Sequence, residues 1–135
     1  MPGFVLARPE HQEVYVCMTG EAKVLVFDTK TRALKREILT KLGTRALTFN
    51  EQKGVGYAAN YYTDSITMFG LSSGKEIKTA TFKLNPDDVA LSADGSELYV
   101  TCTGTGELVV VDPLTLAERR RFKAGPYPSD MTLVH

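Results

Sequence analysis

The 135-residue sequence predicts an all-β fold made of three consecutive four-stranded antiparallel units, each 42 residues long. One observation is the period itself, because Tyr15, Tyr57 and Tyr99 are each separated by 42 positions. A second is that the three copies align without any insertion or deletion. A third is that the apolar segments of each copy have the length and alternation of strands. We therefore expect no helix.

Other residues keep the same frame and make chance agreement implausible. Asp28 and Asp112 lie two periods apart, and Gly70 occupies the position between them. Further sets on the frame are Pro2 with Pro86 and Pro128, Thr31 with Ser73 and Thr115, and Val26 with Met68 and Val110.

Each unit contains four short apolar segments, and each segment has the length of a short strand. The third segment of a unit is almost continuously apolar, so we expect it to be buried on both faces. The fourth segment alternates more visibly between polar and apolar residues. In chain order the segments cover residues 4–7, 14–17, 24–27 and 36–39, then 46–49, 55–58, 66–69 and 77–80, and finally 89–92, 98–101, 108–111 and 119–122.

The connections carry residues that favour tight turns. In the third unit, Gly95 can adopt a positive φ between the first two strands. His11 and Lys53 hold that position in the other units, which predicts looser or more strained turns there. Asp28 and Asp112 follow the third strands, where an aspartate can accept hydrogen bonds from its own backbone two residues on.

Four short antiparallel strands in a unit of about 40 residues are typical of a β-propeller blade. The sequence therefore predicts one partial propeller domain over residues 1–135. Its predicted parts are blade 1 at residues 2–43, blade 2 at 44–85, blade 3 at 86–127 and the first strand of a fourth blade at 128–135.

The third unit resembles the YVTN-type β-propeller repeat in its proline, its turn, its tyrosine strand and its closing glycine. The residues that carry this resemblance are Pro86, Val89-Ala90-Leu91-Ser92, Asp94-Gly95, Leu98-Tyr99-Val100-Thr101, Val109-Val110-Val111-Asp112 and Gly125. The first unit keeps Val14-Tyr15-Val16 and ends at Gly43, whereas the second departs most, with Gly70 in place of the aspartate. The absence of tryptophan separates the chain from the WD-repeat kind.

This resemblance implies a fold similar to the propellers of quinoprotein amine dehydrogenases and of some haem-bearing nitrite reductases. None of the functional residues of those enzymes is matched, so we expect no cofactor and no catalytic residue in this chain. The resemblance also suggests a periplasmic or cell-surface protein. The N-terminus lacks the basic segment and long apolar run of a signal peptide, so the location stays open.

Composition excludes several classes of function. Lys plus Arg balance Asp plus Glu at 16 each, so no net charge attracts nucleic acid. The longest apolar runs, such as residues 108–111, are far too short to span a membrane. With only two histidines, we expect no histidine-based metal site or catalytic triad. Cys17 and Cys102 lie in different blades, and the simplest interpretation is two buried, inert thiols.

Candidate binding residues gather on one predicted face. The loops between second and third strands and the connections between blades share the face that opens on the central channel. Tyr61 and Tyr62 are good contact residues there, although one ring could simply pack on a neighbouring blade. Arg45 and Asp88 start inner strands and could pair with each other or with water. The candidate binding residues are Arg45, Tyr61, Tyr62, Asp64, Asp88 and Asp130, and the same face also carries Asn60, Asp87 and Tyr127.

These features favour a non-catalytic binding or scaffold module that presents the channel face to a protein or small ligand. The alternative is a fragment or subunit of an oxidoreductase-like propeller whose cofactor is held elsewhere. A lactonase-type hydrolase is a third possibility, but the chain lacks the histidine and acidic cluster expected of its metal site.

Three blades do not close a propeller, because closed propellers have about four to eight. Either further blades belong to a longer chain or several copies of this chain form the ring. In a head-to-tail dimer, residues 128–134 would compete with residues 4–7 of the next copy for one strand position. That redundancy favours the longer chain.

Overall fold

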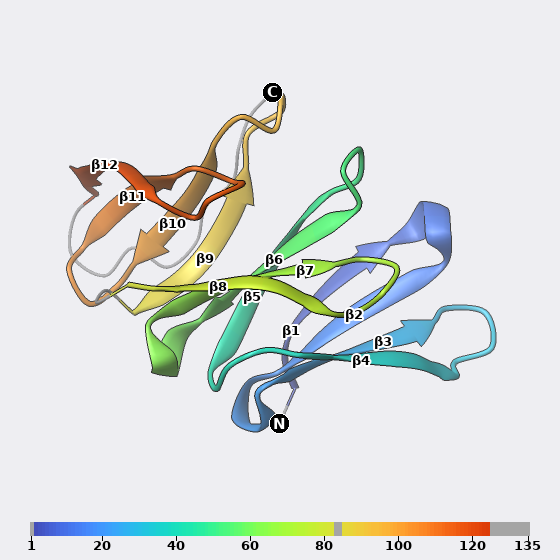
Figure 1. The fold of residues 1–135 in the computed structure, drawn as a ribbon. Helices are drawn as coiled ribbons and strands as arrows, with labels where there is room; N and C mark the ends of the chain where they lie inside the picture. Colours follow the sequence, from blue (N-terminus) through green and yellow to red (C-terminus); the bar gives the residue numbers. More distant parts are fainter. Residues whose placement is uncertain (1, 83–84, 125–135) are drawn as a thin grey trace.

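The computed structural model describes residues 2–82 and 85–124. Within these residues the chain forms three four-stranded antiparallel sheets, and in each sheet the strands follow one another in chain order (Figure 1). The predicted all-β fold of blade-like units is therefore confirmed. The predicted strand at residues 128–135 lies outside the described residues.

The strands of the three sheets recur at closely matching intervals. The first sheet contains β1 (Pro2–Arg8), β2 (Glu13–Met18), β3 (Lys23–Asp28) and β4 (Leu34–Leu39). The second contains β5 (Thr44–Asn50), β6 (Val55–Asn60), β7 (Ser65–Gly70) and β8 (Glu76–Thr81). The third contains β9 (Pro86–Leu91), β10 (Leu98–Cys102), β11 (Glu107–Val111) and β12 (Glu118–Lys123).

The expectation of no helix is wrong in one respect. Within the described residues, single turns of 3-10 helix occupy three of the connections, at Pro9–His11, Thr19–Glu21 and Tyr61–Thr63. A three-residue turn is too short to leave a helical period in the sequence, because one 3-10 turn already spans about three residues.

The turns between first and second strands differ from one sheet to the next. Gly95 has a φ of 75°, as predicted. In the first two sheets the positive φ falls one residue later than expected, at Gln12 (55°) and Gly54 (66°) rather than at His11 and Lys53. The predicted strain is therefore confined to Gln12, since a glycine occupies the position in the second sheet.

The turns between third and fourth strands are closed by aspartate, as the sequence predicts. Oδ1 of Asp28 accepts a hydrogen bond from the backbone N–H of Lys30 at 2.8 Å. Oδ1 of Asp112 accepts the equivalent bond from Leu114, also at 2.8 Å. These local bonds fix the hairpins without help from other sheets.

The core lies between the sheets, and the β5–β8 sheet is packed between the other two (Figure 1). Strand β7 is buried almost throughout, because a sheet covers each of its faces. Strand β3 instead alternates between buried and half-buried residues. The expected burial of third strands on both faces is therefore confirmed for β7 and for the second half of β11, where Val109, Val110 and Val111 are fully buried, but not for β3.

The first two of the repeated tyrosines pack one sheet against the next. Tyr15 is fully buried, with its ring centroid 4.8 Å from that of Phe49 in the second sheet. The hydroxyl of Tyr57 donates to the backbone carbonyl of Pro113 in the third sheet at 2.7 Å. Tyr99 is only half-buried, and its hydroxyl donates to Glu97 of its own sheet.

A buried carboxylate connects the first sheet internally and also to the second sheet. The side chain of Glu13 is only 4% exposed and accepts hydrogen bonds from Arg8 (3.0 Å), Lys35 (2.7 Å) and Arg36 (2.9 Å). Arg8 also pairs with Glu51 of the second sheet at 2.8 Å. Burial alone would raise the pKa of Glu13, but the three cations outweigh it and lower the pKa to about 2.

Tyr57→Phe should destabilise the protein by about 1 kcal/mol, because the buried carbonyl of Pro113 loses its donor. Tyr99→Phe is the matched control at the equivalent position, and it should cost less than half as much. Urea denaturation of both variants tests this. Equal losses of stability in the two variants would mean that the bond from the Tyr57 hydroxyl to the third sheet contributes nothing to stability.

Glu13→Gln should lower the free energy of unfolding by about 3 kcal/mol near neutral pH, since it leaves three cations without their carboxylate. Because the folded-state pKa lies below the unfolded value of about 4.3, this stabilisation is complete above that value. It is lost as the pH falls towards 2. The stability difference between the two proteins, measured by denaturation from pH 7 to pH 2, should therefore shrink below about pH 4.5. A difference independent of pH would contradict the assignment.

Candidate functional site

The loops and blade connections predicted to share one face are bonded to one another. The backbone N–H of Gly43 donates to the carbonyl of Thr19 at 2.9 Å, and that of Tyr61 donates to Gly43 at 2.8 Å. In the third sheet, the backbone N–H of Thr103 donates to the carbonyl of Asn85 at 3.2 Å, which is the equivalent of the Tyr61–Gly43 bond in the second sheet. The Gly43–Thr19 bond therefore holds the 3-10 turn of the first sheet against the start of the second, and the other two bonds fasten the loop after a second strand to the start of its own sheet.

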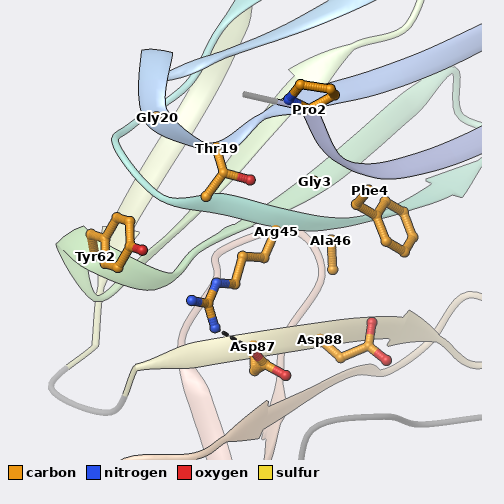
Figure 2. Close-up of a pocket in the computed structure, with 10 residues that line it drawn as sticks. All are labelled: Pro2, Gly3, Phe4, Thr19, Gly20, Arg45, Ala46, Tyr62, Asp87 and Asp88. Carbon is orange, nitrogen blue, oxygen red and sulfur yellow. Dashed lines mark hydrogen bonds and ion pairs between the residues drawn. The ribbon is translucent and has the colours of Figure 1, made fainter.

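A pocket of about 480 Å³ opens on this face, and all three sheets contribute to it (Figure 2). Strand β1 and the turn after β2 supply one wall, β5 and the turn after β6 supply the middle, and β9 supplies the other side. The lining residues are Pro2, Gly3, Phe4, Thr19, Gly20, Arg45, Ala46, Tyr62, Asp87 and Asp88.

Arg45 is the central charged side chain of the pocket. Its Nη1 lies 3.0 Å from Oδ1 of Asp87, and Figure 2 shows the guanidinium directed at that carboxylate. The guanidinium carbon is 3.8 Å from the ring centroid of Tyr61 and 5.5 Å from that of Tyr62. Burial works to lower the pKa of Arg45, but the interactions with Asp87 and Tyr62 outweigh it and raise the pKa. The arginine is thus a fixed, permanent cation.

The two tyrosines form one aromatic unit. Their rings meet edge to face, with centroids 5.6 Å apart. Tyr61 is half-buried behind Arg45, whereas Tyr62 is 57% exposed and lines the pocket. The sequence left open whether one of the two rings packs inward. In the structure Tyr61 packs inward and Tyr62 faces the pocket.

The candidate residues of the sequence are not all brought together. Arg45, Tyr62 and Asp88 line the pocket, and Tyr61 stacks behind it. Asp64 does not line it, because its Oδ1 accepts the backbone N–H of Asn85 at 3.0 Å and fastens the next blade connection. Asp130 and Tyr127 lie outside the described residues.

Asn60 has a structural position instead of a channel-facing one. It is fully buried, with Nδ2 donating to Ser65 (3.1 Å) and Thr67 (2.9 Å). Its Oδ1 accepts from the hydroxyl of Thr44 at 2.7 Å. All of these partners lie within the second sheet, so the amide stabilises that sheet below the pocket.

Asp87 is the main residue that the candidate set omits. A signal for it exists in the sequence, because Gly3, Arg45 and Asp87 occupy the same position of the 42-residue repeat. Equivalent positions of inner strands point towards the same channel, so opposite charges there predict a pair between blades. The contributions of Phe4 and Thr19 had no comparable signal.

The two cysteine thiols do not line this pocket. Cys17 and Cys102 are free and buried, as expected, and burial raises the pKa of both thiols to about 12. Among residues 2–82 and 85–124, no three His, Cys, Asp or Glu side chains are grouped to hold a metal ion. In the same residues no helix is long and apolar enough to cross a membrane.

Gly43 sets the position of the tyrosine unit. Its φ is 91°, and a β-carbon at this residue would clash with the backbone nitrogen of Tyr62. Gly54 also has a positive φ, 66°, but a β-carbon there meets open space. Alanine substitutions at the two glycines therefore separate the effect of backbone strain, which both share, from the effect of direct contact with the site, which only Gly43 has.

Gly43→Ala should destabilise the protein by about 2 kcal/mol or more, because strain and a clash add together. It should also shift the ring resonances of Tyr62 in NMR spectra. Gly54→Ala, the control, should cost about 1 kcal/mol and leave those resonances unchanged. Unaltered Tyr62 signals in Gly43→Ala would show that Gly43 does not position the ring.

Comparisons with known proteins establish the fold. No family model matches the chain. It is 32% identical over 101 residues to antigen Lp49 of Leptospira interrogans, covering 73% of this chain but 22% of that protein.

Two solved structures are similar over nearly the whole chain. Hydrazine synthase of Kuenenia stuttgartiensis superposes with a TM-score of 0.84 at 20% identity, over 93% of this chain and 36% of that one. A Bacteroides uniformis protein assigned as a 6-phosphogluconolactonase gives 0.84 at 18% identity, over 98% and 44%. The chain thus spans less than half the length of the proteins it matches. At these identities the structural likeness shows the fold alone, and with the three blade-like sheets it shows that this chain is a β-propeller-like module.

Proposed function

We propose that the chain is a non-catalytic binding or scaffold module that takes a protein or small ligand at the channel-face pocket. The observation that carries this proposal is the fixed arrangement of Arg45, Asp87 and Tyr62 around a cavity of about 480 Å³. Charged and aromatic side chains that converge on a concave site are typical of ligand binding. The proposal includes membership of the YVTN-type repeat group, which the repeated residues support.

The charges of the pocket favour a cationic ligand group. Its lining includes one arginine and two aspartates, so the carboxylates of the lining outnumber its cations. The carboxylate of Asp88 lies on the same side of the pocket (Figure 2). Phe4 and Tyr62 add aromatic surface, which attracts both apolar groups and cations. A basic side chain of a partner protein or a small aromatic cation fits this chemistry.

A second candidate is a part of an oxidoreductase-like propeller whose cofactor is held elsewhere. The similarity to hydrazine synthase favours it, and the share of 36% of that chain leaves room for other elements. This support comes from the fold alone, whereas the binding proposal is supported by the side chains of the pocket. A lactone hydrolase, suggested by the second structure, has the same limited basis.

Benzamidine, an aromatic cation, should bind in this pocket more tightly than benzoate, an aromatic anion of similar size. In ¹H–¹⁵N NMR titrations, benzamidine should shift the amide signals of Ala46, Tyr62 and Asp88 in a saturable manner. Asp88→Asn should weaken its binding roughly threefold to fivefold, as expected for one partly exposed charge.

Leu114→Ala is the matched control, because Leu114 is exposed and lies outside the pocket. It should leave the benzamidine titration unchanged. Tighter binding of benzoate, or shifts scattered away from the pocket, would contradict the proposed ligand chemistry.

A further inference from the structure

A second pocket lies at the opposite end of the sheets from the channel face. It has a volume of about 420 Å³ and is lined by residues 48–52 of the second sheet and 91–95 of the third. These residues form the ends of β5 and β9 and the turns that follow them. The channel-face pocket instead uses the beginnings of the same two strands. We refer to the second pocket as the turn pocket.

The 42-residue repeat explains why a cavity is left between these two sheets. Between the first and second sheets, the guanidinium of Arg8 meets the carboxylate of Glu51, with Nη2 2.8 Å from Oε1. Asn50 and Ala93 hold the same two repeat positions between the second and third sheets. Their side chains are shorter than those of arginine and glutamate, so no ion pair fills this position and the turn pocket stays open.

The side chain of Asn50 carries a hydrogen-bond donor that is not used. Asn50 is only 8% exposed, and its Oδ1 accepts the backbone N–H of Lys53 at 3.2 Å. Because a backbone N–H can only donate, this bond fixes the orientation of the amide. Nδ2 then faces the third sheet, where a β-carbon at Gly95 would lie 3.2 Å from it. Within residues 2–82 and 85–124 Nδ2 has no acceptor, and a mostly buried donor favours a ligand that supplies one.

Two carboxylates line the turn pocket, and both already have partners. Nε and Nη2 of Arg8 lie 2.9 and 2.8 Å from the carboxylate oxygens of Glu51. Oδ1 of Asp94 accepts from the hydroxyl (2.6 Å) and backbone N–H (3.0 Å) of Ser96 and from the hydroxyl of Ser92 (2.9 Å). These bonds lower the pKa of Asp94 to about 2, so it is ionised at neutral pH and its Oδ2 can accept a bond from a ligand. Among the described residues of the lining there is no Lys, Arg or His.

These groups favour a neutral ligand that both donates and accepts hydrogen bonds. An anion could accept from Asn50, but the two carboxylates of the lining repel it. An ammonium or guanidinium group could pair with Asp94, but it has no acceptor for Nδ2 of Asn50. A hydroxyl both donates and accepts, so two neighbouring hydroxyls match the amide and the carboxylate together. The half-buried side chains of Phe49 and Leu91 add apolar surface for the C–H groups of the same ligand.

We propose that the turn pocket binds a neutral, polyhydroxylated ligand of the size of one sugar ring. In this complex Nδ2 of Asn50 donates to one hydroxyl, and the carboxylate of Asp94 accepts from its neighbour. The volume of about 420 Å³ lies within the range of about 300–1,000 Å³ that small-molecule pockets have. The site is separate from the channel-face pocket and does not depend on the function proposed there.

Three ligands that share a ring and differ in charge test this chemistry: neutral D-glucose, protonated glucosamine and anionic glucuronate. In ¹H–¹⁵N NMR titrations, glucose should shift the side-chain amide of Asn50 and the backbone amides of Gln52, Ala93 and Gly95 in a saturable manner. Glucuronate should bind at least about threefold more weakly, and glucosamine should bind no more tightly than glucose. Tightest binding of either charged ligand, or no saturable shift with glucose, would overturn the proposal.

Asn50→Asp exchanges the unused donor for an acceptor and keeps the bond from Lys53. It should weaken glucose binding about tenfold. Gly95→Ala places a methyl group beside Nδ2 and should also weaken binding. Its matched control is Gly54→Ala, which has the same backbone strain but lies outside the pocket and should bind glucose normally.

Native glucose affinity in Asn50→Asp, or equal affinities in the two glycine variants, would contradict the assigned site. Amide spectra of the free variants verify that each is folded, and the glycine pair suffices if the buried carboxylate unfolds Asn50→Asp. The benzamidine shifts at the channel-face pocket should persist in every variant. Failure at one pocket is therefore distinguishable from failure at the other.

Discussion

The structure depends on the packing of one sheet against the next. A single four-stranded sheet has two faces, and a soluble protein cannot leave large apolar areas of both exposed to water. The middle sheet satisfies this constraint on both sides, and its strand β7 is buried almost throughout as a result. Turns and ion pairs fix the details of how neighbouring sheets meet. Burial between the sheets determines which residues can occupy each position of the repeat.

Polar interactions are placed where sheet packing alone does not define the geometry. Glu13 and its cations lie at the turn end of the first sheet, and Arg8 extends this network to Glu51 in the second. At the opposite end, Asn60 and Thr44 occupy fully buried positions and hydrogen-bond to each other. Since buried polar groups must find partners, each network fixes how two neighbouring segments meet.

The sequence predicted the architecture well, because a period of 42 residues repeats strand lengths, turn aspartates and tyrosines together. Its prediction of the site was partial. Arg45 and Tyr62 both line the pocket, because they lie in loops and strand ends that share a face. Asp64 does not line the pocket, since its bond to the backbone N–H of Asn85 depends on a turn geometry that the sequence does not reveal. The contributions of Phe4 and Thr19 to the pocket could not be predicted, because they depend on how closely neighbouring sheets approach each other there.

The shared repeat position of Gly3, Arg45 and Asp87 has a wider consequence. In a ring of similar units, one sequence position is displayed once per unit around a common axis. The polarity of the channel can then be altered one unit at a time, without any change in the core residues that hold the sheets together. In the proposed binding module, ligand preference and folding stability would thereby be carried by separate positions of the repeat. In this chain the position holds a neutral glycine, a cation and an anion in successive units. The pocket is therefore asymmetric in charge, although the sheets around it are nearly uniform.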